Sequence, residues 1–208
     1  YFEDELHAAV MAAEDAGTYV MVHVYVPEAI RRAIRAGVKS IEHGQLIDEP
    51  TMKLIAEKGV WLSMQPFIGE GNNHYTNPVQ QAKHELVVQG TDRAYQLAKK
   101  YGVKLAWGTD LLFSPANARN QNLNIEKMTR WFSNFEILKM ITHDNAELLA
   151  LSGRRNPYPG KLGVIEEGAL ADLIVVDGNA LEDIKVLTDP GKNMLLIMKD
   201  GKIYKNDL

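Results

Sequence analysis

The sequence of 208 residues contains no cysteine, which excludes disulfide bonds, thiolate-ligated zinc and a thiol nucleophile. No uninterrupted apolar run approaches the ~18 residues of a membrane helix, so we expect no membrane partner. No basic block is present either: 23 Lys and Arg stand against 27 Asp and Glu, for a net charge of −4. A mildly acidic chain of this kind is poorly suited to phosphate backbones, so we expect no nucleic-acid partner.

The composition is that of a folded protein. Apolar residues make up 46% of the chain and charged residues 24%, which predicts a real core and excludes wholesale disorder. The first residue is Tyr1 rather than Met, and no signal-like segment follows. We therefore expect a fragment, a processed product or a trimmed chain, and the compartment stays open between cytoplasm, periplasm and exterior.

One pattern occurs four times in the first half: an amphipathic helical stretch, a glycine, a short spacer and an apolar, β-rich run. Glycine just past a helix is the expected left-handed stop. The glycines are Gly17, Gly37, Gly59 and Gly102, and the runs cover residues 19–24, 40–42, 61–64 and 104–107. Pro27 and Asp48 stand where a helix start tolerates proline and where a cap is needed.

Helices alternating with short buried strands predict an α/β fold with a parallel sheet. Units of this size suit a (β/α)₈ barrel or a doubly wound sheet. No GxGxxG or Walker phosphate loop is present, which disfavours nucleotide binding.

Polar side chains follow these runs at matching distances from the glycines. His23, His43 and Gln65 each come six residues after a stop glycine, and Asp110 comes eight after Gly102. Equivalent positions on neighbouring parallel strands should lie at one height, so two imidazoles and a carboxylate should converge at the carboxyl edge of the sheet. These are ligands that zinc takes, so we predict that His23, His43 and Asp110 bind a metal.

The other histidines are weaker candidates. We expect His7 and His84 on exposed helix faces and His143 at a cap or on the surface. His74 lies in the Gly-, Asn- and Pro-rich segment 66–78 and is a candidate for substrate binding, with an ordinary loop surface as the alternative.

The composition changes after Ser152. Residues 154–160 read as an irregular connector, and residues 171–177 have the pattern of a buried strand. Asp200-Gly201 between two apolar runs is a strong hairpin signal. We therefore predict two domains, residues 1–152 and 153–208.

These motifs together resemble the metal-dependent amidohydrolase superfamily, in its imidazolonepropionase-like branch with the Xaa-Pro dipeptidases. The resemblance rests on VHVYVPEAIRRAIRAGVKSIEHG, WGTD, GVIEEGALADLIVVDGNALEDI and MKDGKIYK, in that order along the chain. It implies a (β/α)₈ TIM-type barrel with a small β-sandwich domain. This chain would supply the C-terminal half of the barrel, strand units 5–8, and part of the sandwich.

The resemblance also implies a zinc site, binuclear in the intact enzyme. His23 matches the fifth-strand ligand, His43 the sixth-strand ligand and Asp110 the eighth-strand ligand. The HxH pair of the first strand is absent, and no lysine precedes Lys39 to serve as the bridging ligand. We therefore expect a missing N-terminal segment, and we expect the 208 residues alone to be inactive.

The implied activity is hydrolysis of amide bonds in a small-molecule substrate, a dipeptide of the Xaa-Pro type or an N-acyl amino acid. A metal-activated water would attack, with Asp110 as general base and then acid. Tyr25, Gln65 and Arg119 are candidate substrate contacts. For Tyr25 a packed aromatic at the rim is the alternative, and for Arg119 a solvated surface position.

Two other functions stay open. One is a deaminase or cyclic-amide hydrolase on the same scaffold. The other is a non-catalytic fragment completed by self-association, as a homo-oligomer, or by a partner chain.

Overall fold

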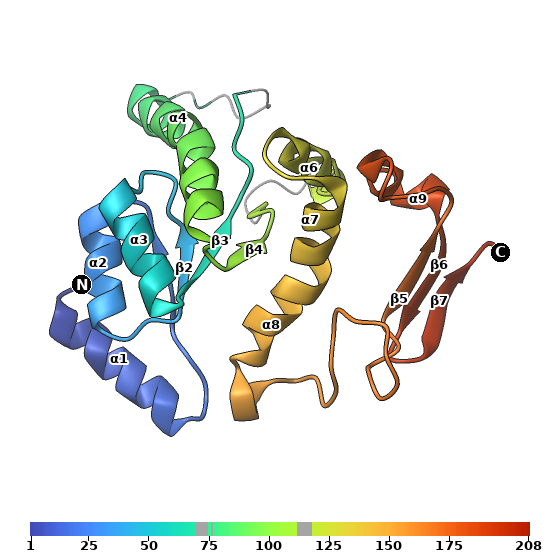
Figure 1. The fold of residues 1–208 in the computed structure, drawn as a ribbon, viewed down its shortest axis with the longest axis horizontal. Coiled ribbons are helices and arrows are strands. Elements are labelled where there is room, and N and C mark those ends of the chain that lie inside the picture. Colours follow the sequence, from blue (N-terminus) through green and yellow to red (C-terminus); the bar gives the residue numbers. More distant parts are fainter. Residues whose placement is uncertain (70–74, 76, 112–117) are drawn as a thin grey trace. The chain divides into compact units, whose positions relative to one another are not determined.

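The computed structural model describes residues 1–69, 75, 77–111 and 118–208 (Figure 1). The packing divides the chain into two compact units. The first comprises Tyr1–Gly108 with Leu151–Arg155, and the second comprises Thr109–Ala150 with Asn156–Leu208.

The first unit is built on a parallel sheet of four strands in the order β1-β2-β3-β4 (Figure 1). The strands are β1 Met21–Val24, β2 Ser40–His43, β3 Trp61–Met64 and β4 Leu105–Trp107. Every residue of β3 is buried, as expected for a central parallel strand covered on both faces. The α/β fold with a parallel sheet is therefore confirmed, and each predicted run contains a strand.

Helices precede and connect these strands. They are α1 Glu3–Asp15, α2 Pro27–Arg35, α3 Glu49–Lys58 and α4 Pro78–Tyr101. Asp48 caps α3, because its side chain accepts a hydrogen bond from the backbone N–H of Thr51. Gly59 and Gly102 end their helices at φ +62°, where glycine avoids the steric cost of a side chain. The predicted caps and stops are thus confirmed.

The core of the first unit lies where helices and sheet meet. Ile30 of α2, Ile41 of β2, Ile55 of α3 and Leu62 of β3 are fully buried. Removing such side chains from water is the main favourable term in folding.

The strand register corrects one prediction. His23 is paired with Glu42, and His43 with Val24, so the two histidines do not lie at one height. The strands begin at different distances from their glycines: β1 begins at Met21 after Gly17, whereas β2 begins at Ser40 after Gly37. Counting from the glycines therefore misplaced β1 against β2 by one residue.

The second unit has a helical segment followed by an antiparallel sheet. The helical segment contains α6 Leu123–Lys127, a 3₁₀ turn Met128–Arg130, α7 Asn134–Lys139, a π-helical stretch Met140–Asp144 and α8 Asn145–Ala150. The 3₁₀ turn Ile184–Leu187 and α9 Pro190–Asn193 precede β6. The strands β5 Leu173–Val176, β6 Met194–Lys199 and β7 Lys202–Asn206 form a sheet in the order β5-β6-β7.

The predicted hairpin is present between β6 and β7. Asp200 and Gly201 have φ of +50° and +73°, as a two-residue turn that follows the strand twist requires. The prediction of a buried strand at residues 171–177 is wrong for this chain, because Ile174 and Val175 of β5 are 51% and 42% exposed.

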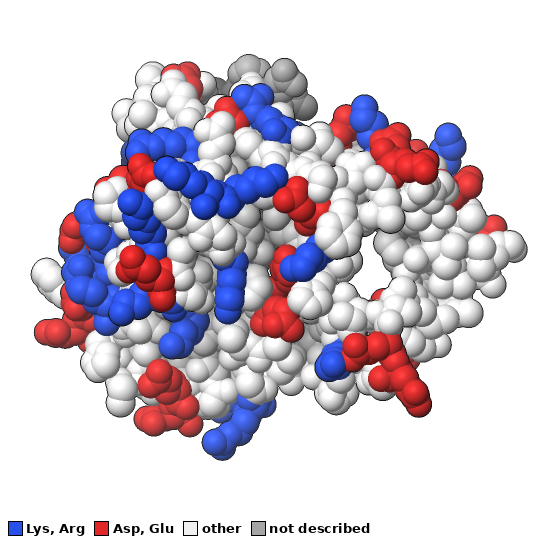
Figure 2. All heavy atoms as spheres, viewed as in Figure 1, with Lys and Arg blue, Asp and Glu red and all other residues white. Residues whose placement is uncertain are grey.

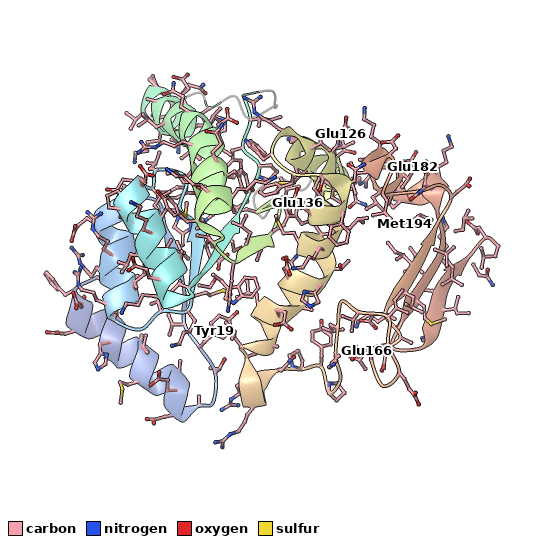
Figure 3. All side chains as sticks on the ribbon, in the orientation of Figure 1. Tyr19, Glu126, Glu136, Glu166, Glu182 and Met194 are labelled. Atoms are coloured by element: carbon pink, nitrogen blue, oxygen red, sulfur yellow. The ribbon has the colours of Figure 1, made fainter. Side chains whose placement is uncertain are left out.

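The packing divides the chain elsewhere than after Ser152. The side-chain amide of Asn122 donates to the Leu187 carbonyl at 2.8 Å, and Glu126, marked in Figure 3, pairs with Lys185 at 3.0 Å. These contacts join the helical segment to the C-terminal segment. The backbone N–H of Arg154, by contrast, donates to the Gly17 carbonyl of the first unit at 3.1 Å.

Basic and acidic side chains are interspersed over the helices of the first unit on the face shown in Figure 2. Several of them form ion pairs, among them Arg31 with Asp48 and Lys100 with Glu49. Among the described residues, no helix is both long and apolar enough to cross a membrane.

Candidate metal-binding site

Two histidines meet at the carboxyl end of β1 and β2. The Nε2 atom of His43 lies 2.6 Å from the Nδ1 atom of His23, and the ring centroids are 4.1 Å apart. His43 is buried, whereas His23 is exposed. A contact this short is a hydrogen bond, so one nitrogen carries a proton and the other offers its lone pair.

The backbone of His43 is strained. It has φ +80°, which is uncommon for a residue with a side chain, and Gly44 follows at φ +73°. The turn is held in place because the Gly44 N–H donates to the Val24 carbonyl at 3.0 Å. Strain of this kind persists where the surroundings enforce it, and it clusters at functional sites.

Two glutamines lie behind His43. The side-chain oxygen of Gln65 is 2.7 Å from Nδ1 of His43, and the amide nitrogen of Gln45 donates to that oxygen at 3.4 Å. Both glutamines are buried. The sequence predicts Gln65 as a candidate substrate contact that lines the pocket. Gln45 is not predicted, because its only signal is its position two residues after His43.

Tyr25 completes a group of three rings. Its ring stacks on His43 with centroids 4.7 Å apart and planes 13° apart, and it meets His23 edge-on at 5.1 Å. The structure therefore brings together four of the predicted site residues, His23, Tyr25, His43 and Gln65.

The strand β2, which carries His43, also carries an acidic group. Glu42 accepts a hydrogen bond from the Ser40 hydroxyl at 2.6 Å. Burial, together with the negative charge of Glu42, raises the pKa of the Tyr19 phenol, which is marked in Figure 3. Tyr19 thus stays neutral at physiological pH.

Three predicted site residues remain: Asp110, Arg119 and His74. Asp110 and Arg119 belong to the second unit and are both exposed. Asp110 has φ +50°, a strained backbone like that of His43. His74 lies outside the described residues. Within the described part of the chain, no group of three or more His, Asp or Glu side chains is placed to hold a metal.

The histidine pair supplies a donor set that fits part of a metal site. Two nitrogens that bind one zinc at tetrahedral angles are about 3.3 Å apart, whereas these are 2.6 Å apart. The two rings would have to separate and lose their shared hydrogen before both nitrogens could act as ligands. Imidazole nitrogens suit zinc and other divalent transition metals, and the pair alone does not select among them.

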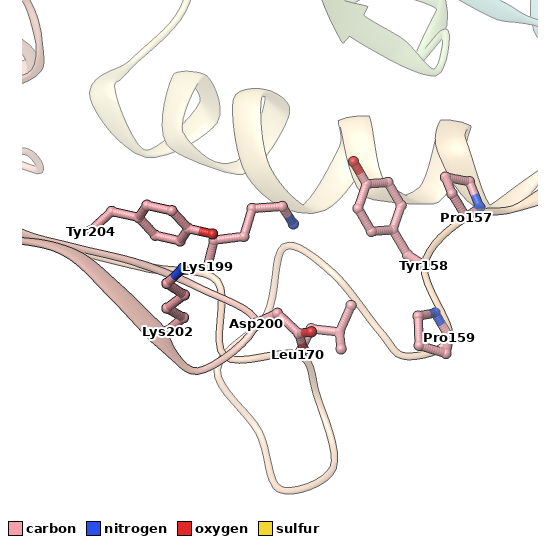
Figure 4. Close-up of a pocket in the computed structure, with 8 residues that line it drawn as sticks. All are labelled: Pro157, Tyr158, Pro159, Leu170, Lys199, Asp200, Lys202 and Tyr204. Carbon is pink, nitrogen blue, oxygen red and sulfur yellow. The ribbon is translucent and has the colours of Figure 1, made fainter.

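A separate cavity of about 390 Å³ lies in the second unit, beside the hairpin (Figure 4). The ammonium group of Lys199 lies 4.8 Å from the centre of the Tyr158 ring at this cavity. None of the predicted site residues lines it. Its lining residues are Pro157, Tyr158, Pro159, Leu170, Lys199, Asp200, Lys202 and Tyr204.

Comparison with known proteins identifies the family. Residues 1–204, nearly the whole chain, match the model of the amidohydrolase family. The chain belongs to the amidohydrolase family. This family is generally metal-dependent, in keeping with the histidine pair.

Relatives of this amidohydrolase chain include ochratoxinase of Aspergillus niger, which is 32% identical over 206 residues, 97% of this chain and 41% of the relative. A crystal structure of a prolidase complexed with N-methylphosphonate-L-proline has a TM-score of 0.87 at 36% identity, covering 99% of this chain and 50% of that one. A Xaa-Pro dipeptidase with methionine bound in its active site has a TM-score of 0.82 at 31% identity, with 99% and 49% covered. The chain therefore spans half or less of the length of these relatives.

Proposed function

We propose that the protein containing this amidohydrolase chain hydrolyses amide bonds, in dipeptides of the Xaa-Pro type or in N-acyl amino acids. We place its metal site at His23, His43 and Asp110. The observation that carries the proposal is the pair of imidazoles 2.6 Å apart at the carboxyl edge of a parallel sheet, in a chain of this family. Strained backbones at both His43 and Asp110 support it.

The proposal for the fold follows from the share of the related structures that this chain covers. We propose that the four parallel strands are strand units 5–8 of a (β/α)₈ barrel, and that β5–β7 are part of a β-sandwich domain. In support, the chain covers half of the prolidase structure at a TM-score of 0.87. Barrel enzymes place their chemistry at the carboxyl ends of the strands, where His23 and His43 lie.

The roles of the residues follow from their chemistry. His23 and His43 would hold a divalent metal, which we propose to be zinc and, in the whole enzyme, binuclear. When bound, such a metal acidifies a water molecule and polarises a carbonyl group. Asp110 would accept a proton from the attacking water on its carboxylate and donate it to the nitrogen of the leaving amine.

The substrate class is proposed from the relatives and from the predicted contacts. The related prolidase and Xaa-Pro dipeptidase support a dipeptide. The guanidinium of Arg119 would bind the substrate carboxylate in a bidentate manner. His74 and the hydroxyl of Tyr25 are further proposed substrate contacts.

The test is product analysis with the full-length, metal-loaded protein. Xaa-Pro dipeptides and N-acyl amino acids are expected to release free amino acids, and Asp110→Asn is expected to lower the rate by about 10²–10⁴-fold. Asp15→Asn, an exposed aspartate at the end of α1, is the matched control. Ammonia release without amino acid release would instead assign a deaminase or cyclic-amide hydrolase, and an unchanged rate in Asp110→Asn would remove Asp110 from the mechanism.

We also propose that the 208 residues alone do not catalyse this reaction. In the first unit, β1 and β4 are each paired on one side only among the described strands, and such edges favour association. The chain alone should therefore be inactive and self-associated, as a homo-oligomer or with a partner chain, when its size is measured by light scattering. Hydrolysis by a monomeric 208-residue chain would contradict this expectation.

A further inference from the structure

We propose that Gln65 is a positioning residue that holds the neutral ring of His43 in the Nδ1–H tautomer, with the Nε2 lone pair facing His23. The inference rests on the proposed function only for its consequence, that Nε2 is the atom offered to a metal. It changes the role of Gln65 from a substrate contact to a group that acts through His43.

The donor and acceptor roles follow from the chemistry of the amide. The atom of Gln65 that faces His43 is the carbonyl oxygen, 2.7 Å from Nδ1, and a carbonyl oxygen can only accept. Nδ1 of His43 must therefore carry a hydrogen. In the neutral ring the other nitrogen, Nε2, then carries the lone pair, and it lies 2.6 Å from His23.

The direction of the Gln65 amide is supported by its neighbour Gln45. The amide nitrogen of Gln45 donates to the same Gln65 oxygen at 3.4 Å. If the Gln65 amide alone were reversed, its NH₂ group would face the NH₂ group of Gln45, and two donors would meet without an acceptor. Gln45 thus favours the orientation that presents oxygen to His43.

Burial makes this arrangement costly to lose. His43, Gln45 and Gln65 are 4%, 1% and 5% exposed, so water has little access to replace a missing partner. A buried donor left without an acceptor loses its hydrogen bonds to water and gains none in return.

The consequence concerns metal affinity. A histidine that binds metal through one nitrogen usually donates its other N–H to a fixed acceptor, and losing that acceptor typically weakens binding by about 10–100-fold. Gln65 is such an acceptor, and it directly follows β3, the strand that neighbours the one carrying His43.

The experiment reads the tautomer directly in the metal-free, full-length protein. Long-range ¹H–¹⁵N correlation spectra of histidine-labelled protein, at a pH where the ring is neutral, should show His43 as the Nδ1–H form. Gln65→Met, which keeps the volume and removes the acceptor, should shift His43 to the other tautomer or to a mixture. It should also weaken zinc binding by about 10–100-fold in a chelator competition.

Gln65→Glu restores an acceptor and should restore the Nδ1–H form, which separates the tautomer effect from misfolding. Gln96→Met, at an exposed position of α4, is the control and should change neither reading. The inference is overturned if wild-type His43 is the Nε2–H form, or if folded Gln65→Met keeps the wild-type tautomer. The proposed function fails separately, if the tautomer behaves as expected but no amide substrate is hydrolysed.

Discussion

The Nε2 atom of His43 and the Nδ1 atom of His23 lie 2.6 Å apart, so one proton is held between two imidazoles of neighbouring strands. Metal binding at these two atoms requires that hydrogen to leave the contact, moving to the other nitrogen of its own ring when the ring is neutral. The pair is therefore a proton-linked site, in which metal and proton compete for the same lone pairs.

The first prediction follows from this competition. In the full-length protein, zinc binding should weaken as the pH falls into the range where imidazole is protonated, and there it should release protons, because only the neutral ring binds the metal. Calorimetry in buffers of different ionisation enthalpy measures the number released. Replacing His43 with alanine should remove this pair's contribution, while His7→Ala on the exposed face of α1 should leave it unchanged. Proton release that stayed the same in His43→Ala would show that the pair does not bind the metal.

The second prediction concerns Tyr25, whose ring stacks on His43 with planes 13° apart. Because the ring packs against the imidazole, Tyr25→Ala should loosen His43 and weaken zinc binding, whereas Tyr25→Phe should preserve it. Kinetics of the Tyr25→Phe protein then isolate the hydroxyl: if the hydroxyl binds the substrate, KM should rise while zinc affinity stays unchanged. Weakened zinc binding in Tyr25→Phe would contradict a packing role for the ring.

The site residues could be predicted from the sequence to different degrees. His23 and His43 could be chosen because each lies near the end of a short strand of a repeated unit. The heights of the two histidines in the sheet could not be predicted, because the spacers between glycine and strand differ in length and shift β1 against β2 by one residue. The two rings still meet, and His43 has a positive φ where they do. No residue pattern predicted this backbone conformation.

The side-chain partners within the site could not be predicted from the sequence. No sequence pattern indicates that the Gln65 oxygen lies 2.7 Å from Nδ1 of His43, because the contact depends on the packing of β2 against β3. Local features could be predicted from the sequence. The cap at Asp48 and the turn at Asp200 depend on a few adjacent residues, and both were predicted. The exposure of β5 was not predicted. An apolar composition indicates that a strand can be buried, but it does not indicate whether any part of this chain covers the strand.

The third prediction concerns Asp48, which caps α3 and pairs with Arg31 at 3.2 Å. Partial burial opposes its ionisation, but hydrogen bonds from Thr51 and Arg31 outweigh burial and lower the pKa of the carboxyl below its ordinary 3.8. A lowered pKa means that the carboxylate stabilises the folded state fully above the ordinary value and loses this contribution as the pH falls through the lowered one.

Urea unfolding of the full-length protein tests this. Asp48→Ala should lower the free energy of unfolding by about 1 kcal/mol at pH 7. Asp48→Asn keeps a capping oxygen and should lose less, and its stability should lack the acid-dependent part that Asp48 contributes. Equal losses in the two variants at pH 7 would show that the charge, and not the cap, dominates.

The last prediction concerns Gly90, in the middle of α4, which packs directly on the backbone beside the site. A Cβ atom placed there would lie 2.2 Å from the carbonyl oxygen of Gln45. Alanine normally stabilises a helix interior over glycine by about 1 kcal/mol. Here overpacking, at about 1–3 kcal/mol, should exceed that gain and lower the free energy of unfolding. The shift of Gln45 should also disturb the tautomer of His43 in the same spectra, because Gln45 orients Gln65. Gln96→Ala, on the same helix and exposed, should leave both readings unchanged. A stabilised Gly90→Ala protein would show that α4 can move away from residue 45 without cost.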